Sequence, residues 1–206
     1  MVEMSVNRLP KSIKRFSREP GSRLVAEQYL FKIYKTPIVD YQGNSRDFTI
    51  IQRPDTVSII PVLDNGKILI ANEEQPHWGT AGKVIMSGTR EKGESIVDAA
   101  KRELMEEAGL IMKDYYHVMT YRMGALEWFF HQVVARVEVK WVEPQLEPGE
   151  SLTVQDYSLE EIIQMIREEQ FIYPPRLLES YMLTDRLDEL RDLLAHPDRY
   201  QVSWQD

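Results

Sequence analysis

The stretch GTREKGESIVDAAKRELMEEAGL, at positions 88–110, constrains the fold of this chain more than any other part of the sequence. Ser95 followed by Asp98 is typical of a helix N-cap, and Gly109 suits the left-handed residue that ends a helix. The sequence therefore predicts a helix that begins near Ile96 and ends before Gly109. Its narrow apolar stripe, which should face a core, consists of Val97, Ala100, Leu104 and Ala108.

Three carboxylates, Glu103, Glu106 and Glu107, crowd the last turns of this helix at i, i+3 and i+4 spacing. Each acid near a helix C-terminus opposes the helix dipole at a cost of about 0.3–1 kcal/mol. Ion pairs between Arg102 and Glu106, and between Asp98 and Arg102, would relieve a solvated acidic face. A divalent cation is the alternative, because Mg²⁺ prefers hard oxygen ligands gathered on one side. Helix spacing alone leaves both interpretations open.

The residues around the acids decide between them, because together they form the pattern G-x5-E-x7-R-E-L-x-E-E-x-G-L. The matching positions are Gly88, Glu94, Arg102, Glu103, Leu104, Glu106, Glu107, Gly109 and Leu110. This pattern resembles the signature of the Nudix hydrolase family at every defined position. The resemblance implies an enzyme that cleaves a nucleoside diphosphate linked to another moiety, with water as nucleophile and Mg²⁺ or Mn²⁺ as cofactor.

The resemblance also assigns roles to single residues. It implies that Glu103, Glu106 and Glu107 bind the metal together with the backbone carbonyl of Ser87, and that Glu103 and Glu107 are catalytic. Glu94 and Arg102 would orient these carboxylates without touching the substrate. Gly88 would permit a tight turn from strand to loop.

The general base is expected in an acidic loop over residues 143–150, as in related enzymes. Glu147 and Glu150 are its candidates, and Pro148-Gly149 between them would act as a hinge. A motif glutamate is the alternative base, and a solvated loop acid remains the other interpretation of each candidate.

Aromatic side chains predicted near the metal face offer surfaces for a base or a sugar. Trp78 and Trp128 are the substrate-binding candidates, with Tyr121 and Phe129 as further possibilities; core packing is the alternative for each of them. Glu127 lies close to the pocket in the family's layout and is a third candidate. His131 is expected to be a hydrogen-bonded structural histidine.

Beyond the motif, the chain resembles the ADP-ribose pyrophosphatase branch over roughly residues 27–172. Arg53-Pro54-Asp55 matches the entry to that branch's first core strand, and Gln75 matches a glutamine after the second. In that branch the N-terminal segment is exchanged between subunits, which implies a homodimer.

The sequence also departs from this branch. Met86-Ser87-Gly88 replaces its proline-alanine-glycine, and Leu126 stands where a proline marks ADP-ribose specificity. ADP-ribose and a nucleoside diphosphate sugar are therefore both expected substrates. NADH, diadenosine polyphosphates and a non-catalytic role as a nucleotide sensor are the alternatives.

The pattern of elements predicts an α/β/α sandwich, of the α+β class, with a mixed sheet, an N-terminal β extension and C-terminal helices. The expected division is an arm and β segment over residues 1–54, a hydrolase domain over 55–172 and a helical extension over 173–206. Single strands are expected at 25–35 and 84–86, a hairpin turns at Asn65-Gly66, and helices are expected at 158–170 and 176–195.

Composition excludes several other classes of protein. The 206 residues include no cysteine, which excludes disulfides and thiolate metal sites, and no apolar run is long enough for a membrane helix. A net charge of -8 disfavours nucleic acid as a partner. No signal-peptide pattern is present, so a cytoplasmic location is expected.

Overall fold

The computed structural model describes residues 12–14, 19–75, 79–122, 126–139, 145–146 and 151–205. The strands are β1 (Ser12–Lys14), β2 (Arg23–Gln28), β3 (Phe31–Val39), β4 (Ser45–Gln52), β5 (Thr56–Val62), β6 (Ile68–Glu74), β7 (Gly82–Val84), β8 (Met86–Thr89), β9 (Leu110–Arg122), β10 (Leu126–Glu127), β11 (Phe129–Val139), β12 (Ser151–Tyr157) and β13 (Ser203–Gln205). The helices are α1 (Ile96–Ala108), α2 (Leu159–Arg167), α3 (Arg176–Leu183) and α4 (Leu187–Ala195), with a short 3-10 helix η1 (Pro197–Tyr200).

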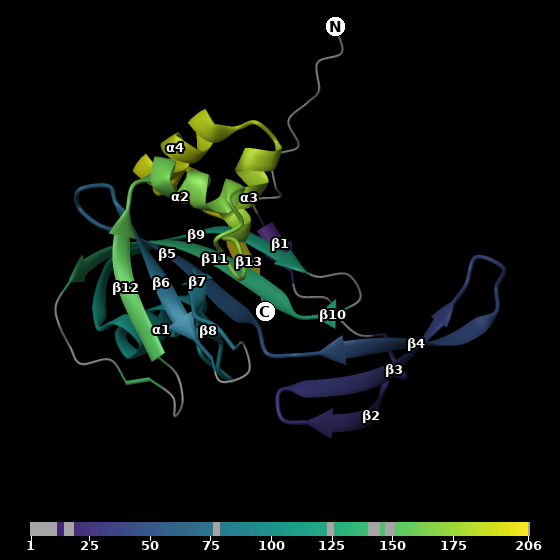
Figure 1. The fold of residues 1–206 in the computed structure, drawn as a ribbon. Helices are drawn as coiled ribbons and strands as arrows, with labels where there is room; N and C mark the ends of the chain where they lie inside the picture. Colours follow the sequence, from purple (N-terminus) through teal and green to yellow (C-terminus); the bar gives the residue numbers. More distant parts are fainter. Residues whose placement is uncertain are drawn as a thin grey trace, which may run out of the picture.

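A mixed sheet in the order β12-β6-β5-β11-β9 forms the centre of the molecule, with β7 paired to β6 and β8 paired to β5. Strands β5 and β11 run parallel, whereas the other pairs in this sheet are antiparallel. Helix α1 lies against one face, and α2, α3 and α4 lie against the other (Figure 1). The predicted α/β/α sandwich is therefore confirmed.

Each face of the sheet carries its own apolar core. On the α1 face, Ala100 and Leu104 pack with strand residues such as Val57 and Val133. On the opposite face, Leu177 and Leu190 of the terminal helices pack with Ile60 and Val134. Full burial of such aliphatic side chains contributes roughly 1.5–3 kcal/mol each. The core on the α1 face holds α1 against the strands that precede it.

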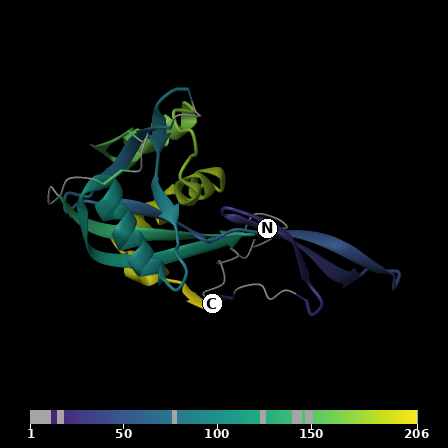
Figure 2. The ribbon, with the colours of Figure 1, turned by 90° about the horizontal axis from the view of Figure 1, so that it is seen from below.

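A second sheet, in the order β10-β4-β3-β2, extends away from this body (Figures 1 and 2). Its strand β10, which directly precedes β11 of the central sheet, pairs in parallel with β4 through Leu126–Ile51 and Glu127–Gln52. Every residue of β2 is exposed, and Val39 at the end of β3 is 73% exposed. The expected N-terminal β extension is thus present and carries uncovered apolar side chains.

Three expected elements are wrong in detail. The single strand expected over 25–35 is a hairpin, because Tyr29 turns the chain with φ 49°. The single helix expected over 176–195 is two helices, because Asp185 adopts φ 54° between α3 and α4. The strand expected at 84–86 divides between β7 and β8, which pair with different neighbours.

Other expectations hold. The hairpin at Asn65-Gly66 is present, with Gly66 at φ 81°. None of the helices in the described ranges is long and apolar enough to cross a membrane.

Candidate active site

Helix α1 has the ends that the sequence predicts. The Ser95 side chain accepts a hydrogen bond from the Asp98 backbone N–H at 3.1 Å. At the other end Gly109 adopts φ 60° and its N–H donates to the Met105 carbonyl at 3.0 Å. These ends orient the helix so that Glu103 lies on its buried side and is 8% exposed, while Glu106 and Glu107 are half-buried.

Gly88 makes room for the Glu103 carboxylate. A Cβ atom at position 88 would lie 1.8 Å from Glu103 Cδ and 1.8 Å from Oε1, far inside any permitted contact. Gly88 belongs to β8, where it pairs with Val57, and its φ is not in the left-handed region. The expectation that this glycine serves a tight turn is therefore wrong; its missing side chain allows a carboxylate to lie against the strand.

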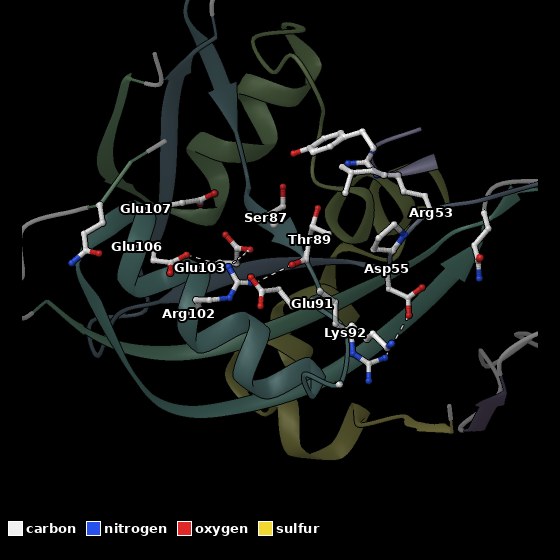
Figure 3. A pocket seen from close by; sticks show the side chains of 18 of the residues that line it. Arg53, Asp55, Ser87, Thr89, Glu91, Lys92, Arg102, Glu103, Glu106 and Glu107 are labelled. Carbon is white, nitrogen blue, oxygen red and sulfur yellow. Dashed lines mark hydrogen bonds and ion pairs between the residues drawn. The ribbon is translucent and has the colours of Figure 1, made fainter. Parts of the chain in front are cut away.

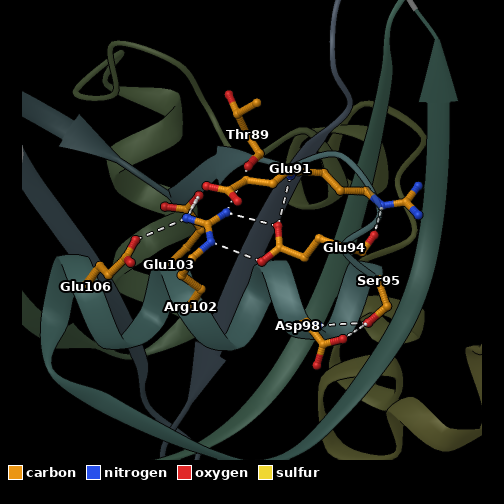
Figure 4. Close-up of polar contacts among 9 residues, drawn as sticks. Thr89, Glu91, Glu94, Ser95, Asp98, Arg102, Glu103 and Glu106 are labelled. Carbon is orange, nitrogen blue, oxygen red and sulfur yellow. Dashed lines mark hydrogen bonds and ion pairs between the residues drawn. The ribbon is translucent and has the colours of Figure 1, made fainter.

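Arg102 joins the acids into one network (Figure 4). Its Nη1 donates to Glu103 Oε1 at 2.8 Å and to Glu106 Oε2 at 3.1 Å. Its Nε donates to Glu94 Oε1 at 3.0 Å and its Nη2 donates to Glu94 Oε2 at 3.2 Å. Nη2 also donates to the Thr89 carbonyl at 2.9 Å. The planar guanidinium therefore fixes two of the three clustered carboxylates relative to β8.

The ion pairs considered from the sequence are only partly found. The expected ion pair between Arg102 and Glu106 is present. Arg102 also forms an ion pair with Glu103, which helix spacing did not indicate. Asp98 does not pair with Arg102 in the described structure; its carboxylate accepts from the Ser95 hydroxyl at 2.6 Å.

Electrostatics distinguish the two best-placed acids. Burial raises the pKa of Glu103, and the nearby Arg102 charge only partly opposes this effect. Burial also acts to raise the pKa of Glu94, but hydrogen bonds from Arg102 and the Glu91 N–H hold it below its usual value. Glu94 is thus a firmly ionised anchor for Arg102, whereas ionised Glu103 is only partly compensated by protein charges.

Two cavities meet at this cluster. The first, of about 1140 Å³, lies between α1, β8 and the β2–β3 turn, and its lining includes Arg53, Arg90, Lys92, Glu103 and Glu106 (Figure 3). The second, of about 1170 Å³, lies over the sheet next to the start of α3. The residues that line both cavities are Arg53, Ser87, Gly88, Thr89 and Glu107.

The donor chemistry of this junction fits a divalent cation. Carboxylate and backbone carbonyl oxygens are the ligands that Mg²⁺ and Mn²⁺ take. The space at Gly88 admits the Glu103 carboxylate, and a cation there would offset the penalty that burial places on its charge. Within the described ranges no three acidic or histidine side chains form a ready-made ion site, and Glu103 and Glu106 both bind Arg102 Nη1. A cation would therefore draw these two carboxylates partly away from the arginine.

The other residues predicted for the site fall in different places. Trp128 lines the second cavity, where its Nε1 donates to Thr56 Oγ1 at 3.0 Å. Glu127 is buried and accepts from Gln52 Nε2 at 3.0 Å, which ties β10 to β4. The remaining candidates, Trp78, Glu147 and Glu150, lie outside the described residues.

Arg53 is a site residue to which the sequence analysis gave no role. Its guanidinium carbon lies 4.2 Å from the Trp128 ring centroid and 5.6 Å from that of Phe31, and the side chain lines both cavities. The available signal was its position in Arg53-Pro54-Asp55, directly before the first core strand. His131, as expected, is a structural histidine: it is fully buried and lies 3.0 Å from Thr120 Oγ1.

A mixed-sheet sandwich whose acid-bearing helix places a buried carboxylate against a glycine of the preceding strand is the arrangement of the Nudix class of diphosphate hydrolases. Comparison with known proteins agrees. A family model described as NUDIX domain matches residues 52–177. The chain therefore belongs to the Nudix family and is a Nudix pyrophosphohydrolase, as the sequence motif predicted.

Two similar proteins lie in the branch that the sequence indicated. An ADP-ribose pyrophosphatase of Bacillus subtilis (strain 168) is 23% identical over 156 residues, which are 72% of this chain and 84% of that protein. A solved structure described as an ADP compounds hydrolase superimposes with a TM-score of 0.63 at 22% identity, covering 89% of this chain and 99% of the other. Nudix hydrolases as a family use divalent metal ions and nucleotide substrates.

Proposed function

We propose that this enzyme hydrolyses the diphosphate linkage of ADP-ribose or a related nucleoside diphosphate sugar, releasing a nucleoside monophosphate and a sugar phosphate. The observation that carries the proposal is the position of the acid cluster where two large cavities meet. Glu107, Ser87 and Gly88 line both cavities, so a diphosphate at this junction leaves room for a different group on each side. The two relatives act on ADP-ribose and on ADP compounds, according to their names.

Each part of the site has a role in this reaction. Glu103, Glu106, Glu107 and the Ser87 carbonyl would hold Mg²⁺ or Mn²⁺, which neutralises developing phosphate charge and lowers the pKa of bound water. Arg102 orients Glu103 and Glu106, and Glu94 holds Arg102 in place. The basic side chains along the first cavity, among them Arg53, Arg90 and Lys92, offset the repulsion between an acidic protein and a diphosphate.

Glu147 and Glu150 remain the candidates for the general base. The described part of their segment, Gln145 and Leu146, lines the first cavity, and the Gln145 N–H donates to the Glu106 carbonyl at 2.7 Å. Glu147 follows Leu146 directly in the sequence. This proximity to the cluster supports a base that accepts the proton of the attacking water from this segment.

The function is tested with a panel of ADP-ribose, nucleoside diphosphate sugars, NADH and diadenosine polyphosphates, with Mg²⁺ and Mn²⁺ and with products separated by chromatography. We expect metal-dependent release of a nucleoside monophosphate, fastest with ADP-ribose or a nucleoside diphosphate sugar. Fastest cleavage of NADH or a diadenosine polyphosphate would move the assignment to that class. No turnover of any compound, together with a ligand-induced rise in melting temperature, would identify a nucleotide sensor instead.

We also propose that the enzyme is a homodimer whose two subunits contact each other through strands β2, β3 and β4 of the second sheet. Leu24, Val25, Phe31 and Phe48 of this sheet are each 42–48% exposed, and Tyr29 at its β2–β3 turn is 88% exposed although it lines the first cavity. Apolar patches of this kind mark association surfaces. Light scattering after size-exclusion chromatography should give twice the monomer mass for the wild type and the mass of one monomer for Phe48→Glu. A monomeric wild-type enzyme with full activity would refute the dimer.

A further inference from the structure

The floor of the second cavity is built mainly from polar side chains on three adjacent strands, β11, β5 and β8. Register places Phe130 and Gln132 of β11 opposite Thr56 and Ser58 of β5, and these lie opposite Thr89 and Ser87 of β8. Side chains two residues apart on a strand share one face of the sheet. All six residues line the cavity, and five of them, all except Phe130, carry hydroxyl or amide groups beside the acid cluster.

The same sheet face is aliphatic one step further along. Val134 lies opposite Ile60, and both are buried under the terminal helices. Continuation of that pattern would place apolar side chains at positions 58 and 132. Serine and glutamine occupy these buried positions instead, with exposed fractions of 7% and 1%. The change from aliphatic to polar coincides with the edge of the cavity.

Gln132 carries the strongest sign of a missing ligand. Its Oε1 atom is buried and has no hydrogen-bond partner within the part of the chain that the structure describes. A buried acceptor without a donor destabilises the folded state, so nearly all such groups in proteins have a partner. A donor group bound in the cavity would supply it.

The aromatic residues beside this floor favour a hydroxylated ligand over a nucleobase. Phe130 stacks on Tyr121 with ring centroids 5.0 Å apart and contacts Trp128 at 4.3 Å. The Arg53 guanidinium lies over the ring of Trp128 in a cation–π contact. Bases are usually held on open aromatic faces, whereas these rings use their faces on one another. On β5, β8 and β11 the floor offers a ligand uncharged hydroxyls and the Gln132 amide, while Tyr173, Arg122 and Arg176 line other parts of the cavity.

We propose that the second cavity binds the uncharged, hydroxyl-bearing end group of the substrate, its terminal sugar, and that Gln132 Oε1 accepts a hydrogen bond from one sugar hydroxyl. This inference rests on the proposed function, because the diphosphate must lie at the junction of the cavities for the sugar to reach the floor. Gln132 then determines specificity without contacting the bond that breaks.

The test compares Gln132→Met, which keeps the length of the side chain but removes the acceptor, with Gln155→Met as a control. Gln155 is an exposed residue of β12 that lines neither cavity. For each enzyme, kcat/KM is measured with ADP-ribose and with an ADP ester of a short alkyl chain that lacks hydroxyls. Because a neutral hydrogen bond left unmade commonly changes binding by roughly tenfold, Gln132→Met should lower the ratio of the two values by about that factor. Gln155→Met should leave the ratio unchanged.

A second readout does not depend on turnover. We expect ribose 5-phosphate to raise the melting temperature of the wild-type protein and to have less effect on Gln132→Met, while the ligand-free variant melts no lower than the wild type. A variant that fails to fold would be replaced by Ser58→Ala, which removes the neighbouring polar group of the floor.

The outcomes separate the two proposals. If the wild type cleaves ADP-ribose and Gln132→Met keeps both the substrate ratio and the ribose 5-phosphate response, the sugar site is wrong and the function stands. The effect of Gln132→Met on kcat/KM is also measured with a substrate in which another base replaces adenine. If the effect disappears with that substrate, the base lies in this cavity and the inference is overturned. If the wild type cleaves neither ADP-ribose nor any nucleoside diphosphate sugar, the proposed function fails, and the melting-temperature response to ribose 5-phosphate still decides whether the sugar site exists.

Discussion

Substitution of Gly88 by alanine is the sharpest test of the assembled acid cluster. The added Cβ would lie 1.8 Å from Glu103 Cδ, whereas ordinary van der Waals contact begins near 3.4 Å. The difference of the two distances, 3.4 minus 1.8, requires the carboxylate to move by about 1.6 Å. The φ angle of Gly88 is not in the left-handed region, so the backbone itself accepts alanine.

The displacement should affect catalysis far more than folding. Misplacement of a catalytic group by about 1 Å can cost roughly 100-fold in rate, so Gly88→Ala should lower kcat/KM by about two orders of magnitude. The moving group is the end of a flexible side chain whose charge is penalised by burial. We therefore expect the free energy of unfolding to stay within about 1 kcal/mol of the wild type, the usual range for a tolerated glycine-to-alanine change.

Gly82→Ala provides a matched control on the neighbouring strand β7. A Cβ at this position would lie 2.4 Å from Ile172 Cγ1, so the crowding is comparable but the neighbour is apolar. This variant should lose about 1–3 kcal/mol of stability through overpacking and keep the metal dependence of the wild type. Turnover measured as a function of Mg²⁺ concentration gives the rate and the metal dependence of both variants, and urea unfolding gives their free energies of unfolding. Wild-type turnover and metal dependence in Gly88→Ala would refute the importance of the Glu103 position.

Local signals in the sequence were sufficient for the elements that local chemistry controls. Ser95 and Gly109 define the ends of α1 through their own backbone preferences, and Asn65-Gly66 defines a hairpin through the positive φ that the turn needs. The helix period placed Glu103, Glu106 and Glu107 together for the same reason. Each of these features depends on residues fewer than eight positions apart.

The wrong expectations concern turns that lack such a signal. Tyr29 and Asp185 both adopt positive φ without being glycine, and the apolar stripe continues through the break between α3 and α4. Neither residue is a glycine and no Asn-Gly type pair stands at either position, so composition did not indicate these turns.

Long-range contacts account for what sequence reasoning missed in the site. The close approach of Glu103 to Gly88 and the grip of Arg102 on the Thr89 carbonyl both depend on how α1 packs against β8. The polar floor of the second cavity depends on the register of β5, β8 and β11. One signal was nevertheless available: Gln132 directly precedes the apolar run Val133-Val134-Ala135 of β11, and a buried amide there requires a partner.

Two further substitutions test the charges of the folded chain. Glu107→Gln should lower turnover by about 100-fold or more through loss of a charged ligand, while removal of a negative charge near the end of α1 should raise thermal stability slightly; equal turnover would contradict the assignment. His117→Gln tests a buried histidine whose Nε2 lies 2.7 Å from Thr120 Oγ1. Burial, with the neighbouring His131, lowers the pKa of His117 from 6.5 to about 4. As the pH falls below 6.5, the unfolded chain therefore binds a proton at this histidine that the folded chain does not bind. The free energy of unfolding should decrease by about 1.4 kcal/mol per pH unit, or by about 3 kcal/mol in total at pH 4. His117→Gln removes this contribution, so between pH 7 and about pH 4.5 urea unfolding should show a loss of stability that is smaller than that of the wild type by about 2.4 kcal/mol. The same pH dependence in both proteins would mean that the folded chain protonates His117 as readily as the unfolded one.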